Sequence, residues 1–213
     1  MADSDYAVLV ARALMEIGAM GFTPNNPVTF KSGLRAPVYV DNRQLISHPD
    51  QWHVVIGAFI VHVAEHEVDM LAGVETAGIP HCSALAYAMN KPSVFVRKQE
   101  KDHGLGRRIE GGEVSGQRVL LIEDMVTTGA SSLNAIQLLR AAGATVNHCL
   151  SIITYGFPET YLRFEEVGIS LLTLTTFPIM LDEALASGMV DEAGADVVRE
   201  WLVDPVRWSE KHP

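Results

Sequence analysis

Cysteine is scarce in this chain, and long apolar runs are missing. The two cysteines, Cys82 and Cys149, lie in separate apolar segments, which predicts buried thiols in a reducing compartment rather than a disulfide scaffold or a metal site. No apolar stretch approaches the roughly 18 residues that span a bilayer, and the first residues are acidic, unlike a secretory signal. We therefore expect a cytoplasmic protein without a membrane segment.

Basic residues are also in deficit. The 213-residue chain carries 16 Lys and Arg against 26 Asp and Glu, a formal net charge of −10. This balance argues against non-specific binding of nucleic acid. With 48% apolar residues, the chain has the composition of a globular protein with a sizeable core. We expect a single domain over residues 1–213.

Two common phosphate-binding signatures are absent, and a different one takes their place. The stretch Val119-Leu-Leu-Ile-Glu-Asp-Met-Val-Thr-Thr-Gly-Ala-Ser131 has neither the Lys of a Walker loop nor the Gly-x-Gly-x-x-Gly of a dinucleotide site. It reads as a buried strand that ends in two acids, followed by a turn of small residues and a helix. The N–H groups of such a turn suit a phosphate, and the acids suit ribose hydroxyls or hydrated magnesium. The motif predicts a phosphorylated sugar; the alternative is an ordinary turn capped by acids.

Apolar runs and helical patterns alternate along most of the chain. We expect strands at 28–30, 38–41, 69–74, 93–96, 118–123, 145–154 and 169–175. We expect helices at 4–19 (with Ser4 as N-cap), 48–66, 80–89, 132–142, 159–167, 179–187 and 190–202. This alternation predicts an α/β fold with a mostly parallel sheet flanked by helices.

Cations gather in one glycine-rich stretch. Arg97, Lys98, Lys101, Arg107 and Arg108 fall within twelve residues, with His103 among them. We expect segment 97–117 to be a long loop without regular structure, which in a compact domain usually signals function. A solvated charged loop is one reading. A lid that closes over an anionic substrate is the reading that we favour.

Four segments, in chain order, resemble those of the type I phosphoribosyltransferases. Residues 119–131 resemble their phosphoribosyl diphosphate (PRPP) motif, and residues 73–80 resemble the loop that contacts pyrophosphate. Residues 97–104 are similar to the catalytic loop of the orotate phosphoribosyltransferase family, and residues 30–41 resemble that family's hood. The resemblance implies that family's fold, with a hood over about residues 1–45 and an acidic helical segment over about 178–213.

The resemblance also implies a reaction: transfer of ribose 5-phosphate from PRPP to orotate in pyrimidine synthesis. It implies Mg²⁺ carried by PRPP, with no dedicated protein metal site. It further implies a homodimer in which loop 97–108 acts on the other subunit's site.

Residue by residue, the resemblance assigns three roles. The catalytic residues would be Lys101, Glu123 and Asp124. Orotate would contact Tyr39, Val40 and Thr127, although Tyr39 is equally well explained as a core aromatic residue. PRPP would be bound by Lys31, Glu75, Thr76, Ala77, Arg97, Lys98, Lys101, His103, Glu123, Asp124, Met125, Val126, Thr127, Thr128, Gly129, Ala130 and Ser131.

Two positions depart from the family's pattern. Ala77 stands where many members carry Lys, and Tyr155 follows strand 145–154 where many carry Asp-Arg. An Arg is the natural bidentate partner of a carboxylate such as that of orotate. Lys31, Arg35, backbone N–H groups or Tyr155 are candidates to replace it. Two alternatives therefore stay open: transfer to another nucleobase, and a regulatory protein that binds PRPP without transferring it.

Overall fold

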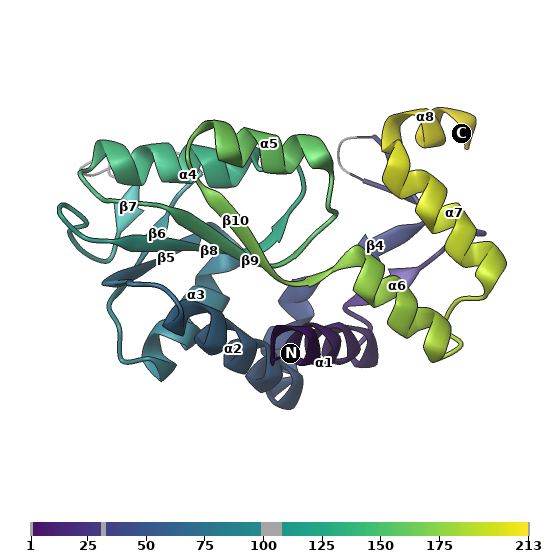
Figure 1. The fold of residues 1–213 in the computed structure, drawn as a ribbon, viewed down its shortest axis with the longest axis horizontal. Helices are drawn as coiled ribbons and strands as arrows, with labels where there is room; N and C mark the ends of the chain where they lie inside the picture. The colour runs from purple at the N-terminus through teal and green to yellow at the C-terminus, as the bar shows by residue number, and fades with distance from the viewer. Residues whose placement is uncertain (1, 31–32, 99–107, 213) are drawn as a thin grey trace.

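A six-stranded sheet forms the centre of the molecule in the computed structural model, which describes residues 2–30, 33–98 and 108–212 (Figure 1). The strand order is β10-β9-β8-β5-β6-β7. All neighbours pair in parallel except β6 and β7, which are antiparallel. The strands are β5 (Met70–Val74), β6 (Ser93–Val96), β7 (Ile109–Glu110), β8 (Val119–Val126), β9 (His148–Thr154) and β10 (Ser170–Thr176).

The chain reverses its direction across the sheet between β5 and β8. From β5 it moves outward through β6 to β7, and from β8 it moves the opposite way through β9 to β10. In open α/β sheets, ligands bind in the crevice at such a reversal, beyond the carboxyl ends of the strands. The motif strand β8 thus lies where the fold offers a binding site.

Helices cover both faces of the sheet. Figure 1 shows α4 (Ala130–Ala141) and α5 (Pro158–Glu166) on one face, and α2 (Pro49–Ala64) and α3 (Gly78–Ala88) on the other. Alternate residues of β8 enter two separate cores, because side chains in a strand alternate between its faces. Leu120 and Ile122 join the core beneath α2 and α3, whereas Val119 and Leu121 join the core beneath α4 and α5.

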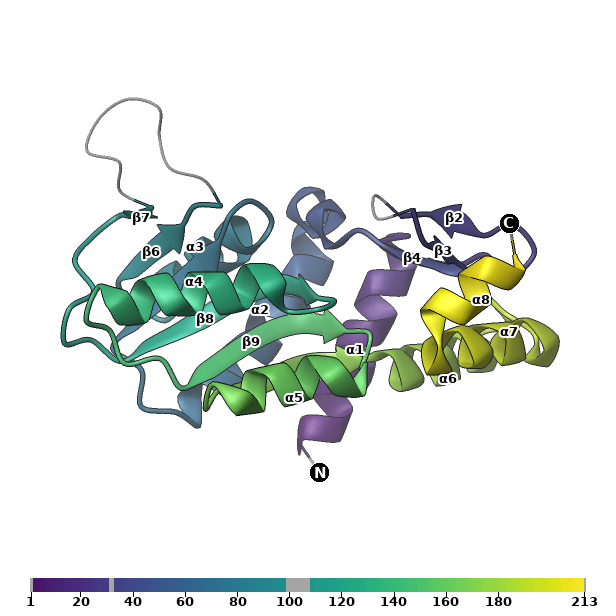
Figure 2. The same ribbon diagram turned by 90° about the horizontal axis from the view of Figure 1, so that it is seen from above.

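The hood is built from short strands near the N-terminus. After α1 (Ala2–Glu16), β1 (Met20–Phe22) pairs with β4 (Val38–Val40), and β2 (Val28–Thr29) pairs with β3 (Arg35–Ala36), both antiparallel. A 3₁₀ helix, η1 (Asn42–Ser47), then leads back to the sheet domain. Figure 2 shows the hood strands beside the C-terminal helices α6 (Phe177–Ala186), α7 (Glu192–Val203) and α8 (Pro205–Lys211).

The predicted α/β class is confirmed, and the differences are local. β8 continues to Val126, so the acids Glu123 and Asp124 lie inside the strand and not at its end. The predicted loop 97–117 contains β7, which pairs with β6. Helix α1 begins at Ala2, two residues before the predicted cap at Ser4. Within the described ranges, no helix is both long and apolar enough to cross a membrane.

The prediction omitted several short elements: β1, β3, η1 and α8. Helix α8 could have been predicted from the sequence, because Asp204 and Pro205 are typical of a helix start. Asp204 caps the helix by accepting from the N–H of Arg207, and Pro205 occupies the first turn. The strands of two or three residues have no such signal. Pairing within the hood, and not the sequence of each strand by itself, defines them.

Candidate active site

Glu123 lies buried in β8 with its carboxylate held by the first turn of α4. The hydroxyl of Ser132 donates to Oε1 at 2.9 Å, and the hydroxyl of Ser131 donates to the same atom at 3.3 Å. The residue is 4% exposed. On the other side, α3 packs closely against β8 at Gly78, because a Cβ there would lie 2.7 Å from the carbonyl oxygen of Ile122.

The acid pair carries raised pKa values. Burial is the main cause of the rise in the pKa of Glu123 to about 7, and the neighbouring charge of Asp124 adds to it. The hydrogen bonds from the two serines and the charge of Lys98 act in the opposite direction. Burial also raises the pKa of Asp124. Two carboxyl groups kept partly from water favour a ligand that brings hydroxyl donors and developing positive charge.

The turn after β8 is held from behind by α5. The hydroxyl of Thr160 donates to the carbonyl oxygen of Thr127 at 2.7 Å, and Arg163 donates to that of Thr128 at 3.4 Å. Gly129 has φ +78°, and a Cβ on it would lie 2.4 Å from the ring of Phe164. The carbonyl groups of the turn thus face α5.

Among the residues that the structure describes, no side chain caps the N-terminus of α4, whose N-cap residue is Gly129. The first N–H groups of a helix have no intrahelical acceptor, and the helix dipole places positive potential there. Ala130 and Ser131 form this first turn, as the phosphate-cradle prediction requires. The arrangement suits a phosphate dianion.

The edge formed by β5 and β6 supplies cations beside the acid pair. Glu75 follows β5 and accepts from the N–H of Lys98 at 2.8 Å, while Arg97 lies 3.2 Å from Glu110 and 3.9 Å from Glu75. Arg108 donates to the carbonyl oxygens of Arg97 and Lys98. A pocket of about 50 Å³ lies here, lined by Val74, Val96, Arg97, Lys98, Arg108, Ser131, Asn134 and Ala135.

The hood presents Tyr39 at its surface. The side chain is 36% exposed, and its ring lies over Gly21, its partner across the β1–β4 pair. A Cβ on Gly21 would come within 2.3 Å of the ring. Tyr39 is therefore not a core aromatic residue. Val40, next along β4, is partly buried.

The structure brings together the predicted residues on three neighbouring segments. Residues 123–131 form the last part of β8 and the turn into α4, Glu75 to Ala77 follow β5, and Arg97 and Lys98 follow β6, all at the carboxyl edge of the sheet. The peptide bond between Glu75 and Thr76 is cis. Lys31, Lys101 and His103 lie outside the described residues.

Tyr155 directly follows β9, the segment in which the sequence lacks the family's Asp-Arg. Its side chain is 5% exposed and stacks on Phe157 and Phe177, with ring centroids 5.6 and 4.6 Å away. Trp201 meets it edge-on. Burial raises the pKa of its hydroxyl well above the usual range. Arg35, another candidate, donates to the carbonyl oxygen of Pro27 within the hood.

Sequence reasoning missed three residues that shape the site: Asn42, Ser132 and Thr160. Asn42 donates through Nδ2 to the carbonyl oxygen of Asp124 at 2.8 Å. Ser132 had a signal, since it adjoins Ser131 and faces the sheet at helical spacing. Asn42 and Thr160 had none, because they come from segments distant in the sequence.

Comparison with known proteins agrees with this geometry. The family profile described as "Phosphoribosyl transferase domain" matches residues 48–160, so the chain belongs to the phosphoribosyltransferases. An orotate phosphoribosyltransferase of Enterococcus faecalis is 36% identical over 94% of this chain and 97% of that protein. One of Phocaeicola vulgatus is 39% identical over 94% and 95%. The chain is a member of the orotate phosphoribosyltransferase family.

Solved structures give the same result for the fold. The orotate phosphoribosyltransferase of Aeropyrum pernix superimposes with a TM-score of 0.72 at 28% identity, covering 82% of this chain and 97% of that one. The UMP synthase of Leishmania donovani superimposes with a TM-score of 0.81 at 26% identity, covering 92% of this chain and 42% of that longer one. The match thus extends beyond the central sheet to the hood and the C-terminal helices.

Proposed function

We propose that this protein transfers ribose 5-phosphate from PRPP to N1 of orotate, giving orotidine 5′-monophosphate and pyrophosphate. One observation carries the proposal. The chain matches orotate phosphoribosyltransferases over nearly its whole length, and the buried Glu123 and half-buried Asp124 lie beside a helix N-terminus without a side-chain cap. These features supply places for the ribose hydroxyls and for the 5-phosphate of the donor.

The reaction places opposite charges on the two sides of the breaking bond. As the bond between C1′ and the pyrophosphate oxygen breaks, its electron pair leaves with pyrophosphate and the ribose becomes cationic. N1 of orotate then bonds to C1′ and loses its proton. Groups that bind these charges more tightly in the transition state than in the substrate accelerate the step.

The acid pair and the turn would hold the sugar. Glu123 and Asp124 would accept hydrogen bonds from the ribose hydroxyls and stabilise the cationic ribose. Glu123 is well suited, because burial strengthens its interaction with positive charge. Residues 127–131 would surround the 5-phosphate, with the turn fixed on its other side by Thr160 and Phe164.

Cations at the edge of the sheet would hold the diphosphate. Arg97 and Lys98 lie at this edge. Lys101 and His103 follow them in the sequence, and the family resemblance assigns them to the diphosphate as well. Lys101 is the proposed partner of the leaving oxygen. Arg97 would exchange its contacts with Glu75 and Glu110 for the diphosphate.

Magnesium would arrive with the donor. The described residues bring no three metal-binding side chains together. The site offers carboxylate and hydroxyl oxygens, hard donors that suit hydrated Mg²⁺. The ion supplies charge neutralisation to the diphosphate when bound. The protein residues themselves then orient the sugar and the leaving group.

We also propose a homodimer in the cytoplasm. By resemblance, loop 97–108 of one subunit acts on the site of the other. The cytoplasmic assignment rests on Cys82 and Cys149, which are both free and buried, as is usual in a reducing compartment.

The direct test follows orotate absorbance with PRPP and Mg²⁺ and identifies the product. Because the family's Arg is absent, the assay is repeated with uracil, hypoxanthine, xanthine and adenine to establish which base the protein uses. We expect consumption of orotate alone. Folded protein that consumed another base, or none, would contradict the proposal. Tight PRPP binding without pyrophosphate release on any base would indicate a regulatory protein.

A further inference from the structure

The C-terminal helices hold the main chain of the hood at one residue. The N–H of Arg35 in β3 donates to the hydroxyl of Ser209 in α8 at 2.9 Å. The carbonyl oxygen of Arg35 accepts from Nε1 of Trp201 in α7 at 3.1 Å. The main-chain N–H and the carbonyl oxygen of Arg35 are thus both bound by side chains that lie more than 160 residues away in the sequence.

The indole that makes one of these bonds is rigidly placed. Trp201 is 1% exposed and meets the rings of Phe30, Tyr155 and Phe157 edge-on, at centroid distances of 6.3, 5.2 and 6.0 Å. Aromatic rings packed in this way have little freedom to turn. Nε1 therefore offers its hydrogen bond in a fixed direction.

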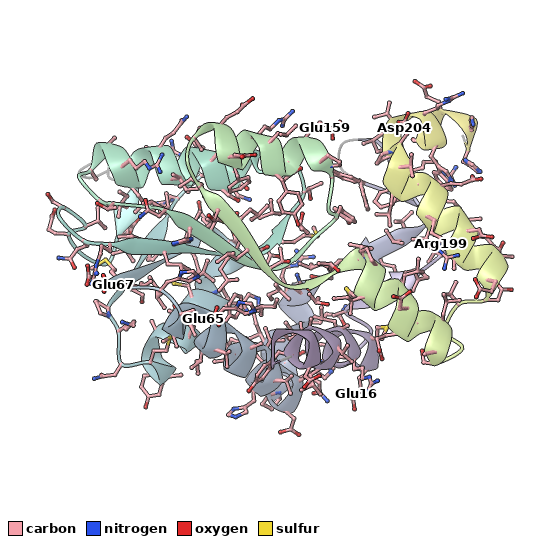
Figure 3. All side chains as sticks on the ribbon, viewed as in Figure 1. Glu16, Glu65, Glu67, Glu159, Arg199 and Asp204 are labelled. Atoms are coloured by element: carbon pink, nitrogen blue, oxygen red, sulfur yellow. The ribbon has the colours of Figure 1, made fainter. Side chains whose placement is uncertain are left out.

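The helix that supplies Ser209 is likewise fixed to α7. Asp204 ends α7 and caps α8, where its carboxylate accepts from the N–H of Arg207 at 3.0 Å. Figure 3 labels Asp204 at this junction and Arg199, which comes earlier in α7. Trp201 and Ser209 thus lie on two consecutive helices whose junction is fixed by this cap.

The strand that they hold is too short to stand alone. In the described part of this hairpin, β2 and β3 pair at Val28 with Ala36 and at Thr29 with Arg35, and the N–H of Phe30 donates to the carbonyl oxygen of Leu34. A two-stranded hairpin is marginal in water without packing against other elements. Beyond Ala36, a single proline separates β3 from β4, which presents Tyr39 and Val40. A shift of β3 would therefore pull on β4 through Pro37, against the pairing of β4 with β1.

We propose that Trp201 and Ser209 are positioning residues for the acceptor base. They fix β3 so that β4 presents Tyr39 and Val40 in the geometry that binds orotate. The inference rests on the proposed function in its choice of base. It assigns a role to the C-terminal helices in substrate binding, although neither residue belongs to the PRPP site.

The test compares three variants with a matched control. Trp201→Phe keeps an aromatic ring and removes the N–H donor, and Ser209→Ala removes the hydroxyl. Ser209→Thr retains a hydroxyl oxygen. Val203→Ala is the control, because Val203 lies on α7 and is 87% exposed. Each protein is assayed for KM of orotate, KM of PRPP and kcat, and for amide hydrogen exchange over residues 33–40.

We expect Trp201→Phe and Ser209→Ala to raise the KM of orotate about three- to tenfold, the range that one lost hydrogen bond gives. The KM of PRPP and kcat should change by less than about twofold. Exchange over 33–40 should accelerate at least about tenfold in both. Ser209→Thr and Val203→Ala should behave as the wild-type protein.

A purely structural role would move different quantities. It would lower kcat with the folded fraction and leave both KM values unchanged, which would overturn the inference. Unchanged exchange over 33–40 would overturn it as well. If the wild-type protein did not use orotate, the proposed function would fail on that result alone. The exchange data, with KM for the base that it does use, would still decide the role of Trp201 and Ser209.

Discussion

The side-chain amide of Asn42 donates a 2.8 Å hydrogen bond to the main-chain carbonyl oxygen of Asp124. Asn42 begins η1, two residues after the hood strand β4, and Asp124 is the second acid of β8. Asn42 is 1% exposed. The bond thus connects the segment that would carry the base to the strand that would carry the ribose.

Asn42→Ala should impair both stability and the alignment of the two substrates. It leaves a buried carbonyl oxygen without this donor, which costs about 1–3 kcal/mol of unfolding free energy. We expect kcat/KM for orotate to fall about tenfold, with smaller change in PRPP affinity. Urea denaturation and steady-state kinetics measure both. Asn147→Ala, at an exposed position, is the control; equal effects in the two variants would remove Asn42 from this role.

Gly21→Ala should weaken base binding at little cost in stability. Its Cβ would lie 2.3 Å from the ring of Tyr39, so the exposed ring must turn away. We expect the KM of orotate to rise about three- to tenfold and the unfolding free energy to fall by less than about 1 kcal/mol. The control is Gly57→Ala in α2, where nothing lies within 4 Å of the new Cβ. There we expect unchanged kinetics and equal or greater stability. An unchanged KM for orotate in Gly21→Ala would show that Tyr39 does not contact the base.

Gly129→Ala should damage the phosphate turn itself. A side chain at φ +78° is strained, and the Cβ would lie 2.4 Å from the ring of Phe164. We expect a loss of about 2–4 kcal/mol of unfolding free energy, with weaker PRPP binding. Gly188→Ala shares the positive φ, at +72°, but has nothing within 4 Å. It should lose only about 1–2 kcal/mol and bind PRPP normally. Similar losses in both variants would mean that Phe164 does not constrain the turn.

Glu123 should make the stability of the ligand-free protein depend on pH. Because its pKa in the folded protein is raised to about 7 from a usual value near 4.5, the folded state binds the proton more tightly than the unfolded state. Its contribution to stability therefore falls as pH rises from about 4.5 to about 7 and is constant above. Relative to Glu123→Gln, the wild-type protein should lose on the order of 2–3 kcal/mol over this range. Urea denaturation at pH 5 and pH 7.5 measures the difference.

Ser132→Ala provides the comparison for that experiment. It removes a hydrogen bond that favours the charged carboxylate, so the pKa of Glu123 should rise further. The pH-dependent loss should then extend to higher pH than in the wild-type protein. A stability difference between wild-type and Glu123→Gln proteins that stayed constant from pH 5 to pH 7.5 would refute a raised pKa.

Lys101→Ala should lower kcat about 100-fold while PRPP binding changes little. The reason is that charge on the leaving oxygen develops only in the transition state. Mixing this variant with Asp124→Asn should restore part of the activity if the loop acts on the partner's site, since one site of a mixed dimer is then intact. Mass spectrometry verifies subunit exchange. Absence of rescue despite exchange would place each site within one chain.

The strands and helices of the central domain could be predicted because their apolar periodicity is strong. The β8 motif also located the acid pair, since a run of four apolar residues such as Val-Leu-Leu-Ile indicates a strand that is buried on both faces. The side-chain partners were less accessible. Glu123 meets Ser132 only after α4 folds back on β8, and the cluster of Phe30, Tyr155 and Trp201 joins three distant segments. Such contacts form between segments that are distant in the sequence, so the local pattern of residues does not predict them.

The ends of the cationic segment meet where β7 pairs with β6. The N–H of Arg97 donates to the carbonyl oxygen of Arg108 at 2.8 Å, and Arg108 binds Lys98 in return. The two points of attachment are thus held together by bonds that do not involve the intervening residues. In engineering terms, this pair is a natural junction for exchanging segments between family members. Chimeras joined at 98 and 108 would compare different segments, Lys101 and His103 included, against one constant set of site residues in β8 and α4.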